Sequence, residues 1–122
     1  MANPLKGEIE ITAGDKSYIL FFDIDAICAM EEATGKGFGA IAAEMQNPAL
    51  MSISMVRRML HAALQQNHPD VTLKEAGEIM VAGGGMLKAI QKIGAAINAA
   101  FPEASGTRRP PKRPKGRTGS TS

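Results

Sequence analysis

The sequence has 122 residues, with 14 lysines and arginines, 12 aspartates and glutamates, one cysteine and no tryptophan. This length suits one domain with one core, and a lone cysteine, Cys28, excludes an internal disulfide. The opening MANPLKGEIEIT lacks the apolar run of a secretory signal, and no apolar run approaches the ~20 residues of a membrane helix. We therefore expect a cytosolic chain without a membrane partner.

The first predicted element is a β-hairpin. Residues 8–13 (EIEITA) alternate polar and apolar side chains with the period of two that a half-buried strand shows. Gly14-Asp15 supplies a turn, and residues 17–22 (SYILFF) have the pattern of the returning strand. Because a lone hairpin is marginally stable in water, we expect helices to cover its apolar face.

Two short helices are predicted next. Asp23 is a suitable N-cap for a helix over about 24–34, because its carboxylate can accept hydrogen bonds from the first free backbone N–H groups. Gly35 and the glycine two residues later end that helix, since glycine tolerates the left-handed conformation best. A second helix over about 38–46 ends before an Asn-Pro pair.

Three further helices complete the predicted fold. Ser52 or Ser54 caps a third helix that runs to about residue 66, and Thr72 and Glu75 form a capping box that opens a fourth, through about residue 82. Three consecutive glycines at 83–85 break the chain before the last helix. That helix carries an apolar stripe made of Leu87, Ile90, Ile93, Gly94, Ile97 and Phe101, and Pro102 ends it. The fold class is α+β and mostly α, in one hairpin-plus-helices domain over residues 1–104.

The C-terminal segment differs sharply from this domain in charge. Residues 102–122 hold six basic side chains against Glu103 alone, a net charge of +5, which leaves −3 for residues 1–101. Its prolines and lack of apolar side chains predict a disordered tail over residues 105–122. The tail could keep the protein soluble, bind an acidic protein, or bind nucleic acid through charge alone, which is the least favoured because no aromatic side chain is present for stacking. The basic residues are Arg108, Arg109, Lys112, Arg113, Lys115 and Arg117.

Residues 21–38 concentrate the side chains that most resemble an active site. Cys28 follows an isoleucine on the apolar face of its helix, and the two histidines lie far along the chain, so we expect core packing rather than nucleophilic catalysis. Asp23 and Asp25 stand where carboxylates favour a helix start, and Glu31 and Glu32 point about 100° apart. Capping and solvation therefore explain these carboxylates better than acid–base chemistry or metal binding.

The remaining candidates for chemistry are equally weak. His61 and His68 are two ligands where a zinc site needs three or four, and His68 is expected to mark a helix end as a partial positive charge. The glycines at 83–85 lack the Lys-Ser/Thr of a phosphate-binding loop. We expect no enzyme, no metal and no cofactor.

One apolar pattern has two interpretations. Half of the eight methionines lie within residues 45–59, and Met51, Met55 and Met59 lie at or near the core stripe of the third helix. Filling the core is the favoured interpretation. The alternative is an adaptable docking surface for a partner, because methionine tolerates poorly matched neighbours.

The chain resembles a known family in three stretches. GEIEITAGDKSYILFFDIDAICAMEEATGKGF (residues 7–38), HPDVTLKEAGEIM (68–80) and AAFPEA (99–104) are similar to the tail assembly chaperones of gene transfer agents and siphophage-like prophages, which are also labelled tail tube proteins. Lys74 replaces an acidic residue of the family pattern, and the basic tail lies outside the similarity. The residues that match the first motif are Phe22, Asp23, Ala26, Cys28, Glu31, Glu32 and Gly35.

This resemblance implies a non-enzymatic role in the cytoplasm of a bacterial host. Tail assembly chaperones bind the long tape measure protein while the tail tube polymerises around it, so the tape measure protein and possibly the tail tube protein are the implied partners, alongside a possible homo-oligomer. A structural tail subunit is the first alternative, although one short hairpin offers little to a β-rich tube. A small protein that binds nucleic acid through its basic tail is the second.

Overall fold

The structure is a computed structural model that describes residue 3 and residues 6–101. Its sheet is the predicted hairpin, in which β1 (Ile9–Ala13) pairs with antiparallel β2 (Lys16–Leu20). The register places Ile11 opposite Tyr18, and Gly14 adopts a φ of 67° in the turn. The alternation of polar and apolar residues therefore predicted both strands to within two residues.

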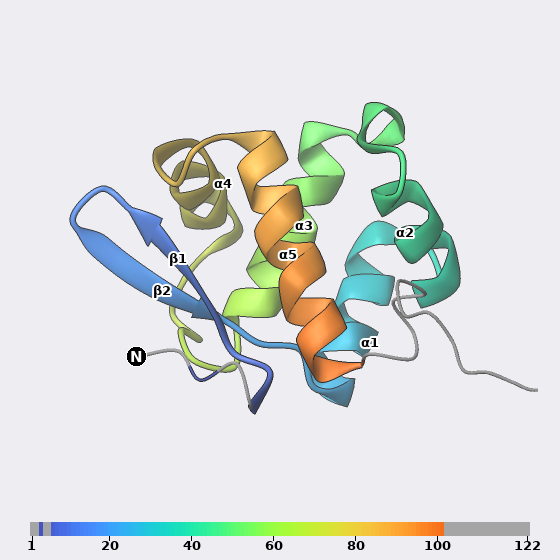
Figure 1. The fold of residues 1–122 in the computed structure, drawn as a ribbon, viewed down its shortest axis with the longest axis horizontal. Helices are drawn as coiled ribbons and strands as arrows, with labels where there is room; N and C mark the ends of the chain where they lie inside the picture. Colours follow the sequence, from blue (N-terminus) through green and yellow to red (C-terminus); the bar gives the residue numbers. More distant parts are fainter. Residues whose placement is uncertain (1–2, 4–5, 102–122) are drawn as a thin grey trace, which may run out of the picture.

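Helices joined by short loops make up the rest of the described chain, as Figure 1 shows. The predicted fold class is confirmed: in the described part of the chain a hairpin precedes five α-helices, and the short 3-10 turn η2 was not predicted by the sequence analysis. The elements are α1 (Ile24–Thr34), α2 (Phe38–Met45), the 3-10 turn η2 (Pro48–Leu50), α3 (Ile53–Leu64), α4 (Leu73–Ala82) and α5 (Met86–Ala100).

Local hydrogen bonds explain where three of these helices begin. Asp23 Oδ1 accepts a hydrogen bond from the Ala26 N–H at 2.8 Å, and of the two serine candidates it is Ser52 that caps α3. Thr72 and Glu75 form the complete capping box at the start of α4. Each cap satisfies backbone donors that the first turn of a helix leaves without partners.

Helix α3 is the centre of the core. It packs against α1, α4, α5 and strand β2, so its side chains meet protein on most sides. The hairpin contributes Ile11, Leu20 and, just after β2, Phe22, all at most 1% exposed. The α3 side chains that are fully buried, at 0% exposure, are Val56, Met59, Leu60, Ala63 and Leu64.

The outer edge of β2 is closed by groups that are not strands. The Ile19 N–H donates to His68 Nε2 at 2.9 Å, and the Phe21 N–H donates to the Ala63 carbonyl at 3.0 Å. These bonds occupy an edge that could otherwise pair with another chain. The expectation that His68 acts as a positive charge at a helix end is wrong, because a ring nitrogen that accepts a hydrogen bond carries no proton.

The glycines at 83–85 have specific structural reasons, close packing at Gly83 and positive φ values at the next two, rather than being a simple flexible break. A Cβ on Gly83 would lie 2.9 Å from the Ile79 carbonyl oxygen and 3.1 Å from two side-chain carbons of Ile11. The two glycines that follow have φ values of 115° and 94°, which L side chains rarely adopt. The end of α4 therefore depends on small residues to lie against β1.

We expect Gly83→Ala to lower the free energy of unfolding by about 1–3 kcal/mol, because the added methyl group must displace backbone or Ile11. Thermal unfolding followed by circular dichroism measures this change. Gly39→Ala in α2 is the control, since a Cβ there meets nothing within 4 Å and alanine favours helix by up to about 1 kcal/mol. Equal melting temperatures for Gly83→Ala and the native chain would contradict the packing argument.

Candidate functional site: an apolar groove beside α5

The methionines near α3 do not form an exposed docking surface. Met51, Met55 and Met59 are 6%, 7% and 0% exposed, so the core-packing interpretation describes them and the expectation of a surplus exposed arc is wrong. The reason is that α1 and α5 cover α3 from different directions, which the apolar pattern of one helix cannot reveal.

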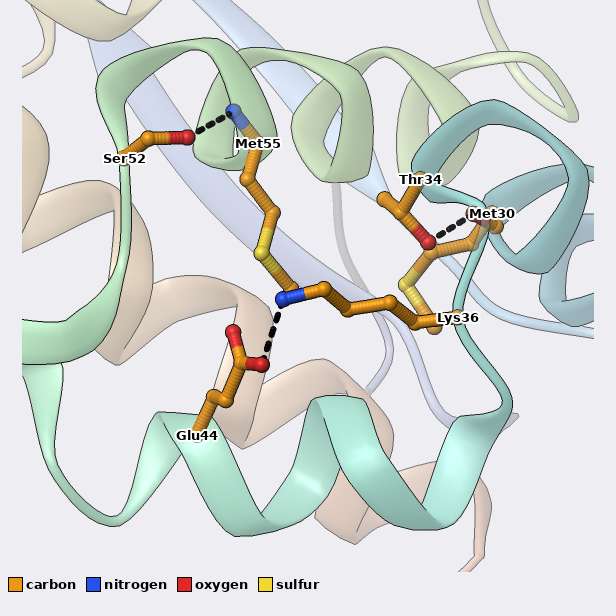
Figure 2. Close-up of polar contacts among 6 residues, drawn as sticks. All are labelled: Met30, Thr34, Lys36, Glu44, Ser52 and Met55. Carbon is orange, nitrogen blue, oxygen red and sulfur yellow. Dashed lines mark hydrogen bonds and ion pairs between the residues drawn. The ribbon is translucent and has the colours of Figure 1, made fainter.

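A polar pair lies beside two of the buried methionines, as Figure 2 shows. Lys36, in the segment after α1, extends toward α2 and forms an ion pair with Glu44. The side chains of Met30 and Met55 point into the same space, with the aliphatic part of the lysine running beside them. Because the lysine side chain is 41% exposed, this pair is worth little to stability and serves as a polar cover for apolar side chains.

The candidate catalytic side chains are not brought together. Cys28 is exposed, so its predicted burial is wrong. Helix α1 buries Ala26 and Met30. Cys28 is two residues from each of them, so its side chain points about 200° around the helix from theirs. Glu31 has a structural role, since its Oε2 accepts a hydrogen bond from the Phe38 N–H at 2.7 Å and caps α2.

The two histidines are also bound to backbone groups. His61 Nε2 donates to the Val71 carbonyl oxygen at 3.0 Å, and His68 accepts from β2 and lies edge-on to the Tyr18 ring, with centroids 5.1 Å apart. Within residue 3 and residues 6–101, no group of three or more His, Cys, Asp and Glu side chains could hold a metal ion.

The clearest candidate site is an open groove between α5 and the segment of α2 and η2. It encloses about 290 Å³ and is mostly apolar, with three side-chain amides and no charged side chain among its lining residues. We call it the α5 groove. Its lining residues are Ala42, Met45, Gln46, Pro48, Ile90, Gln91, Gly94, Ile97 and Asn98.

One face of α5 forms the long wall of the α5 groove. Residues three, four or seven positions apart share one face of a helix. Ile90 is three positions after Leu87 and four before Gly94, so the three residues lie on the same face of α5. Leu87 is 63% exposed, so its predicted place in the buried stripe is wrong. The buried face of α5 is instead centred on Ile93 and Ala96, and Leu87 extends the groove face by one turn.

A second exposed leucine belongs to η2, which contributes Pro48 to the α5 groove. Leu50 follows the groove residue Pro48 by two positions and is 65% exposed. Large apolar side chains this exposed are informative when they adjoin an apolar hollow, because the hollow and its neighbours then form one continuous apolar surface. We therefore take the α5 groove as the candidate surface for a partner, with Leu50 and Leu87 as exposed apolar residues of the two segments that form its walls.

The sequence analysis assigned Gly94 to the core stripe and did not predict this groove. Two signals were available: a glycine inside an apolar helix often marks a close approach, and Leu50 belongs to no periodic stripe. The other predicted partner-binding residues, Arg108, Arg109, Lys112, Arg113, Lys115 and Arg117, lie outside the described residues, as does the predicted tail to which they belong.

Comparison with known proteins adds no relative to this description. No protein-family model, curated protein sequence or solved structure matches the chain. Across the described residues, none of the helices has both the length and the apolar character needed to cross a membrane.

Proposed function

We propose that this chain is a tail assembly chaperone of a phage or a gene transfer agent, acting without enzymatic chemistry in the cytoplasm of the bacterial host. Its partner is the tape measure protein, of which it binds an apolar helical segment in the α5 groove. The observation that carries the proposal is this groove: an open, mostly apolar hollow with no charged side chain among its lining residues.

The physical argument joins the site to the resemblance. An amphipathic helix binds its partner by laying its apolar face in such a groove, which buries apolar surface on both sides. A long helical protein awaiting assembly exposes apolar faces of this kind, and a small protein that covers them keeps it soluble. The sequence resemblance to tail assembly chaperones names the partner, and the groove supplies a surface that suits it.

The test is co-expression of the full chain with the tape measure protein encoded nearby. If the proposal is correct, the tape measure protein becomes soluble and co-purifies with this chain, and its solubility is lost when the chain is omitted. If the tape measure protein stays insoluble and this chain alone assembles into rings or tubes, the structural-subunit alternative replaces the chaperone.

We expect deletion of residues 105–122 to leave co-purification of the tape measure protein unchanged within about twofold, because the groove is built from residues 42–98. The comparison is made with the full chain at equal expression. The opposite result has two parts: the shortened chain no longer binds the tape measure protein, and the full chain binds DNA in a salt-sensitive way that the shortened chain has lost. That result would instead assign the function to the basic tail.

A further inference from the structure

One arginine of α3 lies against α4 without an acceptor for its charge. Arg57 is half-buried, and its Nε atom is buried and has no hydrogen-bond partner among the described residues. No carboxylate of residue 3 and residues 6–101 forms an ion pair with this side chain. Buried polar groups in proteins are usually satisfied, so this guanidinium group calls for an explanation.

A glycine of α4 makes room for Arg57. Gly77 lies in the interior of α4, where glycine is less favourable than alanine for a helix. The Arg57 Cδ and Nη1 atoms lie 3.0 Å and 4.0 Å from the position that a Cβ on Gly77 would occupy. The arginine is therefore held against α4 before any partner arrives, and it loses less conformational freedom on binding than a free surface side chain.

Helices α3 and α4 run antiparallel to each other. The His61 ring, near the end of α3, bonds to the carbonyl oxygen of Val71, just before α4. Arg57, one turn earlier on α3, meets Gly77 further along α4. The start of α3 and the end of α4 therefore point the same way, and in Figure 1 the chain enters α3 and passes from α4 to α5 on the upper side of the view.

Two exposed apolar side chains lie one turn from the contact between Arg57 and Gly77, toward that shared end. Ile53 precedes Arg57 by four residues on α3, and Val81 follows Gly77 by four residues on α4. Residues four apart are neighbours on one face of a helix. Ile53 and Val81 are 62% and 73% exposed, so the arginine has an uncovered apolar side chain beside it on each helix.

We propose that Arg57 is the anchor of a second partner surface, the Arg57 surface, made of Ile53, Arg57, Gly77 and Val81. It binds an aspartate or glutamate side chain of a partner helix, and Ile53 and Val81 cover apolar side chains one turn from that carboxylate. A guanidinium group can form two parallel hydrogen bonds with a carboxylate, and arginine is common among the residues that dominate binding. None of the α5 groove residues belongs to α3 or α4, so this surface lies outside the groove. The inference rests on the proposed function for the choice of partner.

The charge of the Arg57 surface favours a separate, acidic partner. The adjacent Arg58 is exposed and also basic, whereas Glu78 of α4 lines the cleft beside the hairpin. A second copy docked through the same surface would bring Arg57 and Arg58 of both chains together, and like charges in an interface are unfavourable. Residues 102–122 carry six basic side chains against Glu103 alone, so they suit this surface no better.

The test compares Arg57→Gln with Arg58→Gln in the full chain. Both variants remove one positive charge at adjacent positions, but Arg57 lies against Gly77 whereas Arg58 is exposed. The probe is a set of overlapping synthetic peptides that cover the tape measure protein, with binding measured by fluorescence anisotropy and folding checked by thermal unfolding. We expect Arg57→Gln to weaken binding about tenfold or more, and Arg58→Gln to change it by less than about twofold.

Gly77→Ala tests the position of the guanidinium group without changing its charge. The added methyl group would lie 3.0 Å from Arg57 Cδ, so the arginine must shift, and we expect binding to weaken about threefold or more. Gly39→Ala in α2 is the control, since a Cβ there meets nothing within 4 Å.

A change in the peptide identifies the group that Arg57 binds. Replacing the recognised aspartate or glutamate with asparagine or glutamine is expected to weaken binding to the native chain about tenfold, but to change binding to Arg57→Gln by less than about twofold. Such coupling between the two substitutions is the sign of a direct contact.

The outcomes separate this inference from the proposed function. If the native chain binds tape measure peptides and Arg57→Gln binds them equally well, the Arg57 surface is overturned while the chaperone function stands. If size-exclusion chromatography shows a dimer that Arg57→Gln converts to a monomer, the occupant is a second copy and the separate partner is rejected. If neither the peptides nor the whole tape measure protein binds the native chain, the proposed function fails, and this inference fails with it.

Discussion

Replacing Met59 with serine is expected to lower the free energy of unfolding by about 3–5 kcal/mol. The side chain is fully buried at 0% exposure on the central helix α3, so the change removes apolar contacts, leaves a cavity and buries a hydroxyl group. A domain of this size has a total stability of about 5–15 kcal/mol. We therefore expect the melting temperature to fall by more than about 10 °C in thermal unfolding.

The matched control for Met59→Ser is Leu50→Ser, in η2, two residues after the groove residue Pro48. Its side chain is 65% exposed, so its loss is expected to change the free energy of unfolding by no more than about 0.5 kcal/mol. The pair separates core from docking surface, because Leu50→Ser is expected to weaken binding of the tape measure protein while the fold stays intact. If Met59→Ser melts like the native chain but loses the partner, the methionines are a binding surface after all.

Removal of the His68 ring is expected to have the second largest effect on stability. His68→Ala leaves the Ile19 N–H without its acceptor and removes the ring that packs edge-on to Tyr18. An unsatisfied buried or half-buried backbone donor costs about 1–3 kcal/mol. Chemical denaturation at pH 7.5 measures the loss, and hydrogen exchange of the Ile19 amide is expected to become faster.

The same contact makes stability depend on pH. Burial lowers the pKa of His68 below its ordinary value of 6.5, because desolvation disfavours the charged ring. The unfolded chain then binds the proton more readily, so this contribution is complete above pH 6.5 and is lost as the pH falls through 6.5 toward the lower pKa of the folded state. The other ionisable side chains around this loop include Tyr18, Asp70, Glu75 and His61, whose ring donates to the Val71 carbonyl oxygen.

His68→Gln is the control for the pH dependence. Its amide oxygen can accept the hydrogen bond of the Ile19 N–H but does not titrate, so the loss of stability between pH 7.5 and 5.5 is expected to be smaller than in the native chain. Carboxylates with ordinary pKa values change little in this interval. An identical pH profile for the two proteins would mean that His68 is not the responsible group.

Much of this fold follows from local patterns in the sequence. The N-cap at Asp23, the capping box at Thr72 and the alternation in β1 each act through neighbouring residues, and all three predictions are confirmed. Predictions that depend on which elements meet in space were less successful. The exposure of Cys28 and the burial of Met55 are decided by the helices that pack on either side, which one helical period does not specify.

The candidate site is also a feature that depends on which elements meet in space. Gly94 has the same place in the sequence pattern whether the neighbouring segment fills the space above it or leaves a groove. That outcome depends on the path of η2, a short turn after Asn47 whose only local signal is a proline. The groove residues therefore come from two segments about 40 residues apart, and their meeting is a property of the tertiary structure.

The closed edge of β2 also has a consequence for the order of folding during synthesis. The hairpin is translated first, but the partner of its Ile19 amide is 49 residues further along the chain. Since an isolated hairpin is marginally stable and helices form from local contacts, we expect the helical segments to order before the hairpin becomes stable. At a synthesis rate of about 5–20 residues per second, the residues that stabilise the hairpin emerge several seconds after it. During this time the apolar face of the hairpin stays exposed.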